Sequence, residues 1–168
     1  GAIWARIARS AGAQDDFIDV FVTHLEARAD ELRPLQYAEL AEFIKAKSAP
    51  GKPMLLLGDL NTAGMTAERA NPESQYSVMM KAFGDARGEG GITDVWVTLK
   101  GDVLGGTTNQ DSIETGKRID YILLANPTTP SAHLQPVSIE VRTYQDPKVT
   151  ALSDHNAVVA EFNWPGTH

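Results

Sequence analysis

The sequence predicts a mixed α and β fold in which short strands outnumber helices. Runs of β-branched and aromatic residues recur between turn-forming residues, which is typical of strands. Two longer segments instead repeat apolar residues at helical spacing. With 168 residues, no internal repeat and no long linker, the chain is expected to form a single domain over residues 1–168. The expected order is strand, strand, helix, strand, helix and three strands.

The first three elements are a β-hairpin and a helix. Residues 2–9 and 16–24 contain the strand-like segments IWARIA and FIDVFVTH, with a turn at residues 12–15. A helix is expected from Arg33, because Pro34 suits a first helical turn and the Pro-Gly pair at 50–51 ends the segment. Its apolar positions at helical spacing are Leu35, Leu40, Phe43 and Ile44.

The middle of the chain predicts a buried strand, a long loop and a second helix. Residues 53–57 form a continuous apolar run between two glycines, which is typical of a strand buried on both faces. Polar residues 61–71 predict a loop, and residues 72–83 predict a helix. Residues 92–99 predict a short strand or a passage from helix to strand.

The last third predicts three strands and two connections. Residues 101–117 are rich in Gly, Thr, Asn and Asp and predict a loop before a strand at 118–124. Further strands are expected at 139–143 and 157–162, joined by the polar segment 144–156.

Composition narrows the function classes. Hydrophobic residues make up 42% and charged residues 22% of the chain, as in ordinary globular domains. Apolar runs such as 54–57 are too short to span a bilayer. The first residues resemble a strand within a domain, so the sequence does not decide whether a leader peptide precedes them. The absence of cysteine excludes disulfides and cysteine-ligated zinc. The net charge of −7 disfavours tight, sequence-independent binding to nucleic acid.

Polar clusters follow or begin the predicted strands, where loops hold side chains over a pocket. Alone, His24 is better explained as a capping or partly buried histidine than as a catalytic one, whereas an Asx-type turn and a site role explain Asp59 with Asn61 equally well. Asp120 is harder to explain in this way, because a carboxylate inside a strand is unfavourable without a cation or a hydrogen-bond donor. The clusters comprise residues 23–25, 58–61, 107–110, 118–121 and 153–155.

Together these clusters favour hydrolysis of a phosphate ester. They supply oxygen ligands for a hard cation, a base for water and donors for charge that develops on phosphate. The chain has no glycine-rich dinucleotide motif and no Walker motif, so nothing supports redox chemistry with a nucleotide cofactor.

The motifs THL, GDLN, RIDYIL and SDHNAVVAEF, in this order, resemble the later motifs of the endonuclease/exonuclease/phosphatase superfamily. The resemblance spans roughly residues 1–164. It implies a four-layered α/β sandwich of the deoxyribonuclease I-like type, represented here mainly by its second half. It also implies a metal-dependent phosphoesterase that uses Mg²⁺, with Mn²⁺ or Ca²⁺ as substitutes.

The resemblance also implies roles for six residues. His24 would contact the scissile phosphate, Asp59 would position or deprotonate the attacking water beside the metal, and Asn61 would bind a phosphate oxygen. Asp120 would orient His155, which lies beside the phosphate in the family. Asp154 corresponds to a carboxylate on the metal side.

Two family residues have no counterpart in the sequence: an asparagine on the first strand and a glutamate that is the principal metal ligand. Both are expected before residue 1. The last strand, 157–162, would then belong to a sheet built mainly by the other half. An apolar sheet face would be left exposed to water, which is unfavourable by roughly 25 cal/mol for each Å². Three explanations stay open: a second chain supplies that half, processing released the fragment, or two copies associate.

The substrate is less defined than the reaction. Thr108 and Asn109 precede a catalytic strand and are candidate substrate donors, although a plain turn explains them equally well. The acidic charge favours a small-molecule or lipid phosphodiester, with a DNA or RNA nuclease as the alternative. An inactive half-domain that serves as a binding module is the third reading. The segment TTNQDS resembles a bacterial branch with many exported members, so export is favoured over the cytoplasm.

Overall fold

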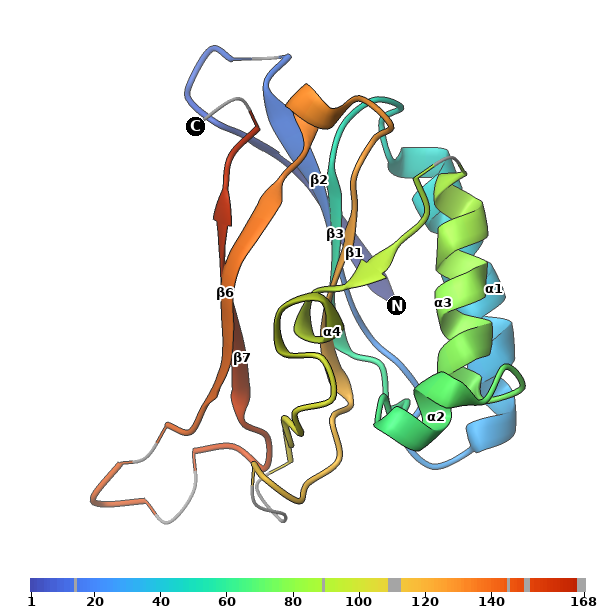
Figure 1. Cartoon of the computed structure of the whole chain (residues 1–168), viewed down its shortest axis with the longest axis vertical. Helices are drawn as coiled ribbons and strands as arrows, with labels where there is room; N and C mark the ends of the chain where they lie inside the picture. The colour runs from blue at the N-terminus through green and yellow to red at the C-terminus, as the bar shows by residue number, and fades with distance from the viewer. Residues whose placement is uncertain (14, 89, 109–112, 145, 150–151, 166–168) are drawn as a thin grey trace.

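The chain folds into two β-sheets and a layer of helices (Figure 1). The computed structural model describes residues 1–13, 15–88, 90–108, 113–144, 146–149 and 152–165. The strands are β1 (Ala2–Ala8), β2 (Phe17–His24), β3 (Met54–Asp59), β4 (Thr93–Asp94), β5 (Asp120–Ala125), β6 (Gln135–Arg142) and β7 (Ala157–Asn163). The helices are α1 (Arg33–Lys47), α2 (Thr66–Ala70), α3 (Gln75–Arg87) and α4 (Val95–Lys100), with single 3-10 turns at Asp30–Leu32 and Pro130–Ala132.

The larger sheet has the order β1-β2-β3-β5-β4, and β6 pairs with β7 in a separate sheet. Strands β2 and β3 run parallel, whereas every other neighbouring pair is antiparallel. Helices α1 and α3 cover one face of the larger sheet, and the β6-β7 pair lies on its other face (Figure 1). The mixed α and β fold predicted from the sequence is therefore confirmed.

Two apolar cores hold these layers together. One core lies between the larger sheet and helices α1 and α3, and its fully buried side chains include Phe21, Tyr37 and Phe83. The other lies between the two sheets and includes Val95 of α4 and Ile139 of β6. Strand β3 contributes to both cores, with Leu56 in the first and Leu55 in the second, so the strand predicted to be buried on both faces is confirmed.

Helix α1 begins where Pro34 predicts it, but its buried face differs from the prediction. Arg33, Tyr37, Leu40 and Ile44 are buried at helical spacing, whereas Leu35 is 65% exposed. Leu35, expected among the apolar positions of this helix, lies about half a turn away from the stripe of Tyr37, Leu40 and Ile44 and therefore faces solvent.

Three local assignments in the middle of the chain change. The predicted loop 61–71 contains helix α2, and α3 begins at Gln75 because the Ser74 hydroxyl accepts a hydrogen bond from the Ser77 amide at 3.1 Å. In the segment 92–99 the order is strand then helix. Asp94 ends β4 and caps α4, and its carboxylate accepts from the Trp96 amide at 3.0 Å.

The described residues account for a helical layer and two sheet layers of the expected sandwich. Figure 1 shows no helix on the outer face of β6 and β7 in the described ranges. On β1 and β2, Ile3, Ile7 and Val22 are 69%, 47% and 43% exposed, so part of an apolar sheet face is open. None of the helices in the described ranges has the length and apolar character needed to cross a lipid bilayer.

Candidate active site

Strand register brings three of the expected site residues to one edge of the larger sheet. His24 is the partner of Asp59 in the parallel pairing of β2 with β3. Asp59 is in turn the partner of Asp120 in the antiparallel pairing of β3 with β5. Since β2 and β3 end at this edge and β5 begins there, the three residues lie side by side although they are far apart in sequence.

His155 joins this row from the connection that leads into β7. Its Nδ1 lies 2.8 Å from Oδ2 of Asp120, and its Nε2 lies 3.8 Å from Oδ2 of Asp59. The same Asp59 oxygen lies 3.3 Å from Nε2 of His24. Asp59 is therefore flanked by two imidazoles, while Asp120 holds one of them.

The surroundings of His155 favour its protonated form. Burial by itself lowers the pKa of the imidazole, but the hydrogen bond and charge of Asp120, together with the charges of Asp59 and Asp154, raise the pKa above its ordinary value. Asp120 is thus placed both to orient the ring through Nδ1 and to stabilise its positive charge.

The surroundings of Asp59 disfavour the ionised form of its carboxyl group, so its pKa is raised. Burial raises the pKa of this carboxyl and the nearby Asp120 raises it further, while the Asn61 amide and the two histidines act in the opposite direction. A carboxylate with a raised pKa is a better proton acceptor at neutral pH than one on the surface.

Asn61 is held in a strained turn beside Asp59. It has a φ of 49°, in the left-handed region, and its amide donates to Oδ1 of Asp59 at 2.9 Å. Its side-chain Nδ2 donates to the Leu25 carbonyl at 3.0 Å, which joins this loop to the one after His24. The Asx-type turn and the site reading are therefore both compatible with the same two residues.

An open cavity of about 360 Å³ lies over this row of side chains. Asp154 lines it and is exposed, so it is available to a ligand. Among the described residues, Asp59, Asp120 and His155 each offer one ligand atom, and these three atoms all lie within 4.8 Å of one another; Asp154 is not in this group. The cavity is lined by His24, Ala27, Asp59, Asn61, Asp120, Asp154 and His155.

The two candidate substrate donors are placed differently. Thr108 forms an isolated antiparallel bridge with His155, which puts the backbones of the two residues next to each other. It does not line the cavity described above. Asn109 lies outside the described residues.

Two buried residues to which the sequence analysis gave no role, Thr107 and Asn156, connect the parts of the site. Thr107 is fully buried, and its hydroxyl accepts from the Asp120 amide at 3.3 Å, while its carbonyl accepts from the Asn156 amide at 2.5 Å. Asn156 in turn accepts from the Thr143 hydroxyl at 3.0 Å. Thr107 therefore ties the start of β5 to the residue after His155. The sequence signal was that Thr107 begins the polar cluster 107–110 and that Asn156 directly follows Ser153-Asp154-His155.

The donor set suits a hard divalent cation. Asp59 and Asp120 each offer a carboxylate oxygen within 4.8 Å of the other, and Asp154 adds an exposed carboxylate at the cavity wall. Carboxylate oxygens are the ligands that Mg²⁺, Mn²⁺ and Ca²⁺ prefer, and Mg²⁺ is commonly held by only one or two of them.

Comparison with known proteins adds an independent line of evidence. The sequence profile described as Endonuclease/Exonuclease/phosphatase family matches residues 3–155. No curated protein matches the sequence.

Solved structures resemble the fold. A humanized TDP2 of D. rerio has a TM-score of 0.67 and 20% identity, covering 96% of this chain and 60% of that chain. A 3' phosphatase from Neisseria, bound to a product DNA hairpin, has a TM-score of 0.60 and 23% identity over 88% of this chain and 62% of its own. The mannosyl-6-phosphatase Bt3783 of Bacteroides thetaiotaomicron has a TM-score of 0.59 and 20% identity, with 97% and 57% covered. The chain thus spans about three fifths of their length.

Proposed function

The chain belongs to the endonuclease/exonuclease/phosphatase family, and from this membership we propose that its site hydrolyses a phosphate ester with an activated water molecule. The observation that carries the proposal is the strand register that aligns His24, Asp59 and Asp120 at one edge of the sheet. A structural role alone would not require two imidazoles and two carboxylates around one open cavity.

Each side chain has a distinct part in the proposed reaction. Asp59 accepts a proton from the attacking water, which its raised pKa favours. Asp120 holds His155 as an imidazolium that donates to the phosphate as negative charge develops. His24 is 69% exposed at the opposite side of Asp59, where it reaches a phosphate oxygen or the leaving group.

The cation is proposed to be Mg²⁺, with Mn²⁺ or Ca²⁺ as substitutes. Asp59 and Asp154 would hold it from the cavity wall, and Asp120 offers a further oxygen close to Asp59. When bound, such an ion stabilises negative charge on the phosphate and lowers the pKa of water.

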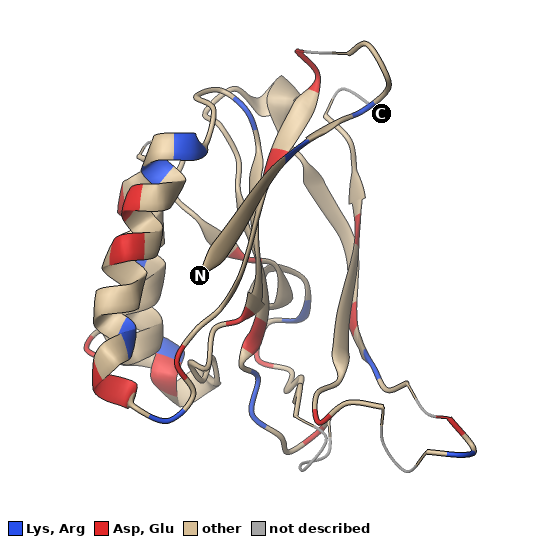
Figure 2. Ribbon diagram, turned by 180° about the vertical axis from the view of Figure 1, so that it is seen from behind, with Lys and Arg blue, Asp and Glu red and all other residues tan. Residues whose placement is uncertain are grey.

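A small-molecule or lipid phosphodiester is the proposed substrate class. The net charge is −7, and Figure 2 shows lysine and arginine scattered singly over several elements instead of gathered in one band. Strong binding to a phosphate backbone needs such a band. A nuclease is the second candidate, because the similar Neisseria phosphatase was solved with a DNA hairpin.

We also propose that a further polypeptide segment completes the metal site. The family glutamate and asparagine have no counterpart in this sequence, and the chain spans 60% of the TDP2 structure that it resembles. The open apolar face at Ile3, Ile7 and Val22 supports such a segment as its cover; a second copy of this chain would cover the face without supplying the two missing residues.

The test is turnover of bis-p-nitrophenyl phosphate, measured with Mg²⁺ and with chelator, together with solution mass. Chelator-sensitive turnover supports the proposed function, and a mass above 18.2 kDa for the active species supports a completing partner. A single-stranded DNA oligonucleotide in the same assay distinguishes the nuclease. Metal-independent turnover, or none in any species that is isolated, would contradict the proposal.

A further inference from the structure

A buried ion pair lies directly behind the candidate active site. Nη2 of Arg118 is 2.9 Å from Oδ2 of Asp94, and the two side chains are only 4% and 2% exposed. Arg118 comes two residues before Asp120, whereas Asp94 ends the edge strand β4. Neither residue lines the cavity, so contact with substrate does not explain the pair.

The same guanidinium also binds the loop that follows Asp59. Nη2 of Arg118 donates to the Gly64 carbonyl at 2.8 Å, and the Gly64 amide donates back to the Arg118 carbonyl at 3.1 Å. The Leu60 amide donates to the Ile119 carbonyl at 2.9 Å in the same ladder. The loop after Asp59 is thereby fastened to the two residues that precede Asp120.

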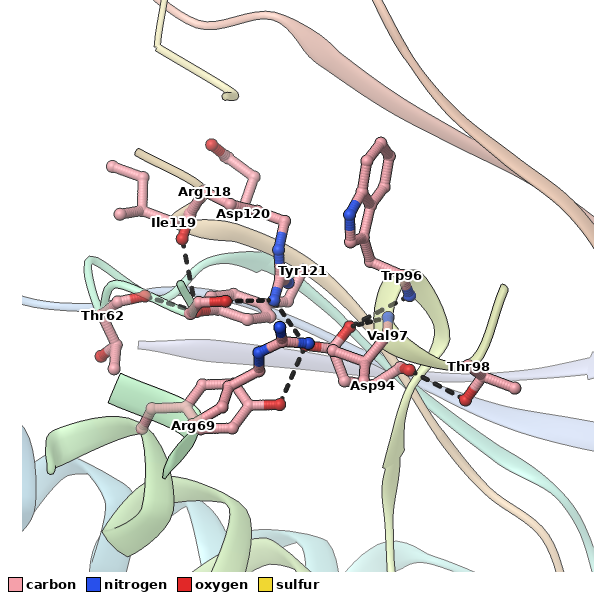
Figure 3. A network of polar contacts seen from close by, with 12 residues as sticks. Thr62, Arg69, Asp94, Trp96, Val97, Thr98, Arg118, Ile119, Asp120 and Tyr121 are labelled. Carbon is pink, nitrogen blue, oxygen red and sulfur yellow. Dashed lines mark hydrogen bonds and ion pairs between the residues drawn. The ribbon is translucent and has the colours of Figure 1, made fainter. Parts of the chain in front are cut away.

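The packing at this junction is tight. A Cβ on Gly64 would lie 2.6 Å from Nη2 of Arg118 and 2.4 Å from the Tyr121 hydroxyl. That hydroxyl donates to the Thr62 carbonyl at 2.5 Å, and Cζ of Arg118 lies 4.8 Å from the centre of the Tyr121 ring. Figure 3 shows Arg118 between Tyr121 on one side and Asp94 on the other.

Asp94 is itself fixed by the groups around it. Its carboxylate accepts from the Trp96 amide at 3.0 Å and from the Tyr76 hydroxyl at 3.1 Å (Figure 3 shows the bond to Trp96). The acceptor for Arg118 is thus anchored to helices α3 and α4, which do not reach the cavity.

We propose that the Arg118–Asp94 pair is a positioning device that sets the spacing between Asp59 and Asp120. A buried ion pair contributes little net stability compared with apolar residues of the same volume, because desolvation of both charges offsets their attraction. Its distinctive property here is geometric, since one nitrogen of Arg118, two residues before β5, binds both Asp94 at the end of β4 and Gly64 in the loop after β3. The inference rests on the proposed function and names two residues that set the geometry of its site.

The experiment compares Arg118→Met/Asp94→Asn with Ile44→Val, a change at a fully buried position of α1 that lies on another element. The double variant removes both charges, and its Asn amide oxygen still accepts from the Trp96 amide, so α4 keeps its cap. Thermal midpoint, kcat and KM for bis-p-nitrophenyl phosphate, and amide hydrogen exchange at Leu60 and Gly64 are measured for each.

The positioning role predicts that kcat falls about 10- to 100-fold in the double variant, while KM changes less than about threefold. Exchange at Leu60 and Gly64 should accelerate at least about tenfold, whereas Ile44→Val leaves both amides and kcat unchanged. Thermal midpoints of the two proteins should agree within about 5 °C. Equal kcat and equal exchange in the two proteins would overturn the inference.

A second variant and a second measurement test the inference where the double variant or the turnover assay fails. If the double variant does not fold, Gly64→Ala disturbs the same contact from the loop side and should give the same changes in kcat and exchange. If no isolated species of the unmodified protein, with or without a completing partner, shows turnover, the proposed function has failed, yet exchange at Leu60 and Gly64 still decides whether the ion pair holds the loop.

Discussion

Two aspartates on the neighbouring strands β2 and β3 differ in how much of the hydrogen-bonding capacity of their carboxylates is used by donors within the protein. Asp19, near the start of β2, is 1% exposed, and its carboxylate accepts from the Trp4 indole at 3.2 Å, from Arg6 at 3.0 and 3.3 Å and from the Ala49 amide at 2.7 Å. All of these donors belong to the fold itself. Asp19 therefore has little capacity left for a ligand.

Asp59, at the end of β3, is arranged in the opposite way. Among the described residues, the Asn61 amide is the backbone donor to its carboxylate, its side-chain neighbours are two imidazoles and the Asp120 carboxylate, and it faces an open cavity. The comparison teaches that burial of a carboxylate does not mark a functional site by itself. What distinguishes Asp59 is that its lone pairs are only partly used by the fold.

The sharpest way to break this comparison is Asp59→Asn. Turnover is expected to fall by about 10³- to 10⁴-fold, because an amide neither accepts the proton of the attacking water nor binds a cation as well as a carboxylate. The thermal midpoint should stay close to that of the unmodified protein, since the amide oxygen still accepts from the Asn61 amide. Turnover within a factor of ten of the original would show that Asp59 is not the base.

Asp120→Asn should have the next largest effect, a loss of turnover of about 10³-fold. The carboxylate both orients His155 through Nδ1 and supports its positive charge, and an amide does only part of the first task. The loss should appear in kcat more than in KM, which steady-state kinetics resolves. Unchanged turnover would remove Asp120 from the site.

Asp19→Asn tests the other half of the comparison and should reverse the pattern. Stability is expected to fall by about 2 kcal/mol, because an amide leaves Arg6 or the Ala49 amide without a full acceptor in a buried position. Turnover per folded molecule should be unchanged. Denaturant unfolding gives the first quantity, and a stable variant with lost turnover would contradict the distinction.

The positions of the strands could be predicted from the sequence, whereas the hydrogen-bond partners of the buried polar groups could not. The apolar run of β3 and the strand-end positions of His24, Asp59 and Asp120 follow from residue type and spacing, which are local properties. By contrast, FIDVFV and RIDYIL both place an aspartate inside a strand, and the sequence does not show which one is satisfied by the fold. The difference depends on the path of β1, which brings Trp4 and Arg6 over Asp19.

The same reason explains why Thr107 and Arg118 were missed as organising residues. Thr107 reaches the Asp120 amide and Asn156, and Arg118 reaches Asp94, through contacts between segments far apart in sequence. Threonine and arginine at these places look like loop and surface residues when only their neighbours along the chain are considered. The assignment of roles to Asn61, Asp154 and Thr108 likewise stays a prediction for experiment.

The smallest expected effect concerns stability as a function of pH in the metal-free protein. Protonation of His155 is favoured by the folded state, since its pKa is raised by Asp120 and by the neighbouring carboxylates despite partial burial. A raised histidine pKa contributes stability that is fully present below the unfolded value, about 6.5, and is lost as pH rises through the folded value.

Asp59 acts in the same direction at lower pH. Burial and Asp120 raise the pKa of this carboxyl, so the folded state binds its proton more tightly than the unfolded state does. Stability contributed by the protonated form is present below the unfolded value, about 3.9, and is lost as pH rises through the folded value. Asp59 and His155 therefore both predict a decrease of unfolding free energy with rising pH, in two separate windows.

Urea unfolding in chelator across pH 4 to 9 measures both windows, with Asp120→Asn as the matched variant. This variant removes the largest group that raises the pKa of His155 and one that raises the pKa of Asp59, so both slopes should become shallower. Asp19→Asn should retain both slopes around a lower mean stability, because its carboxylate lies at the far end of β2 from this cluster. A slope near neutral pH that persists in Asp120→Asn would mean that a group other than the Asp120–His155 pair sets it.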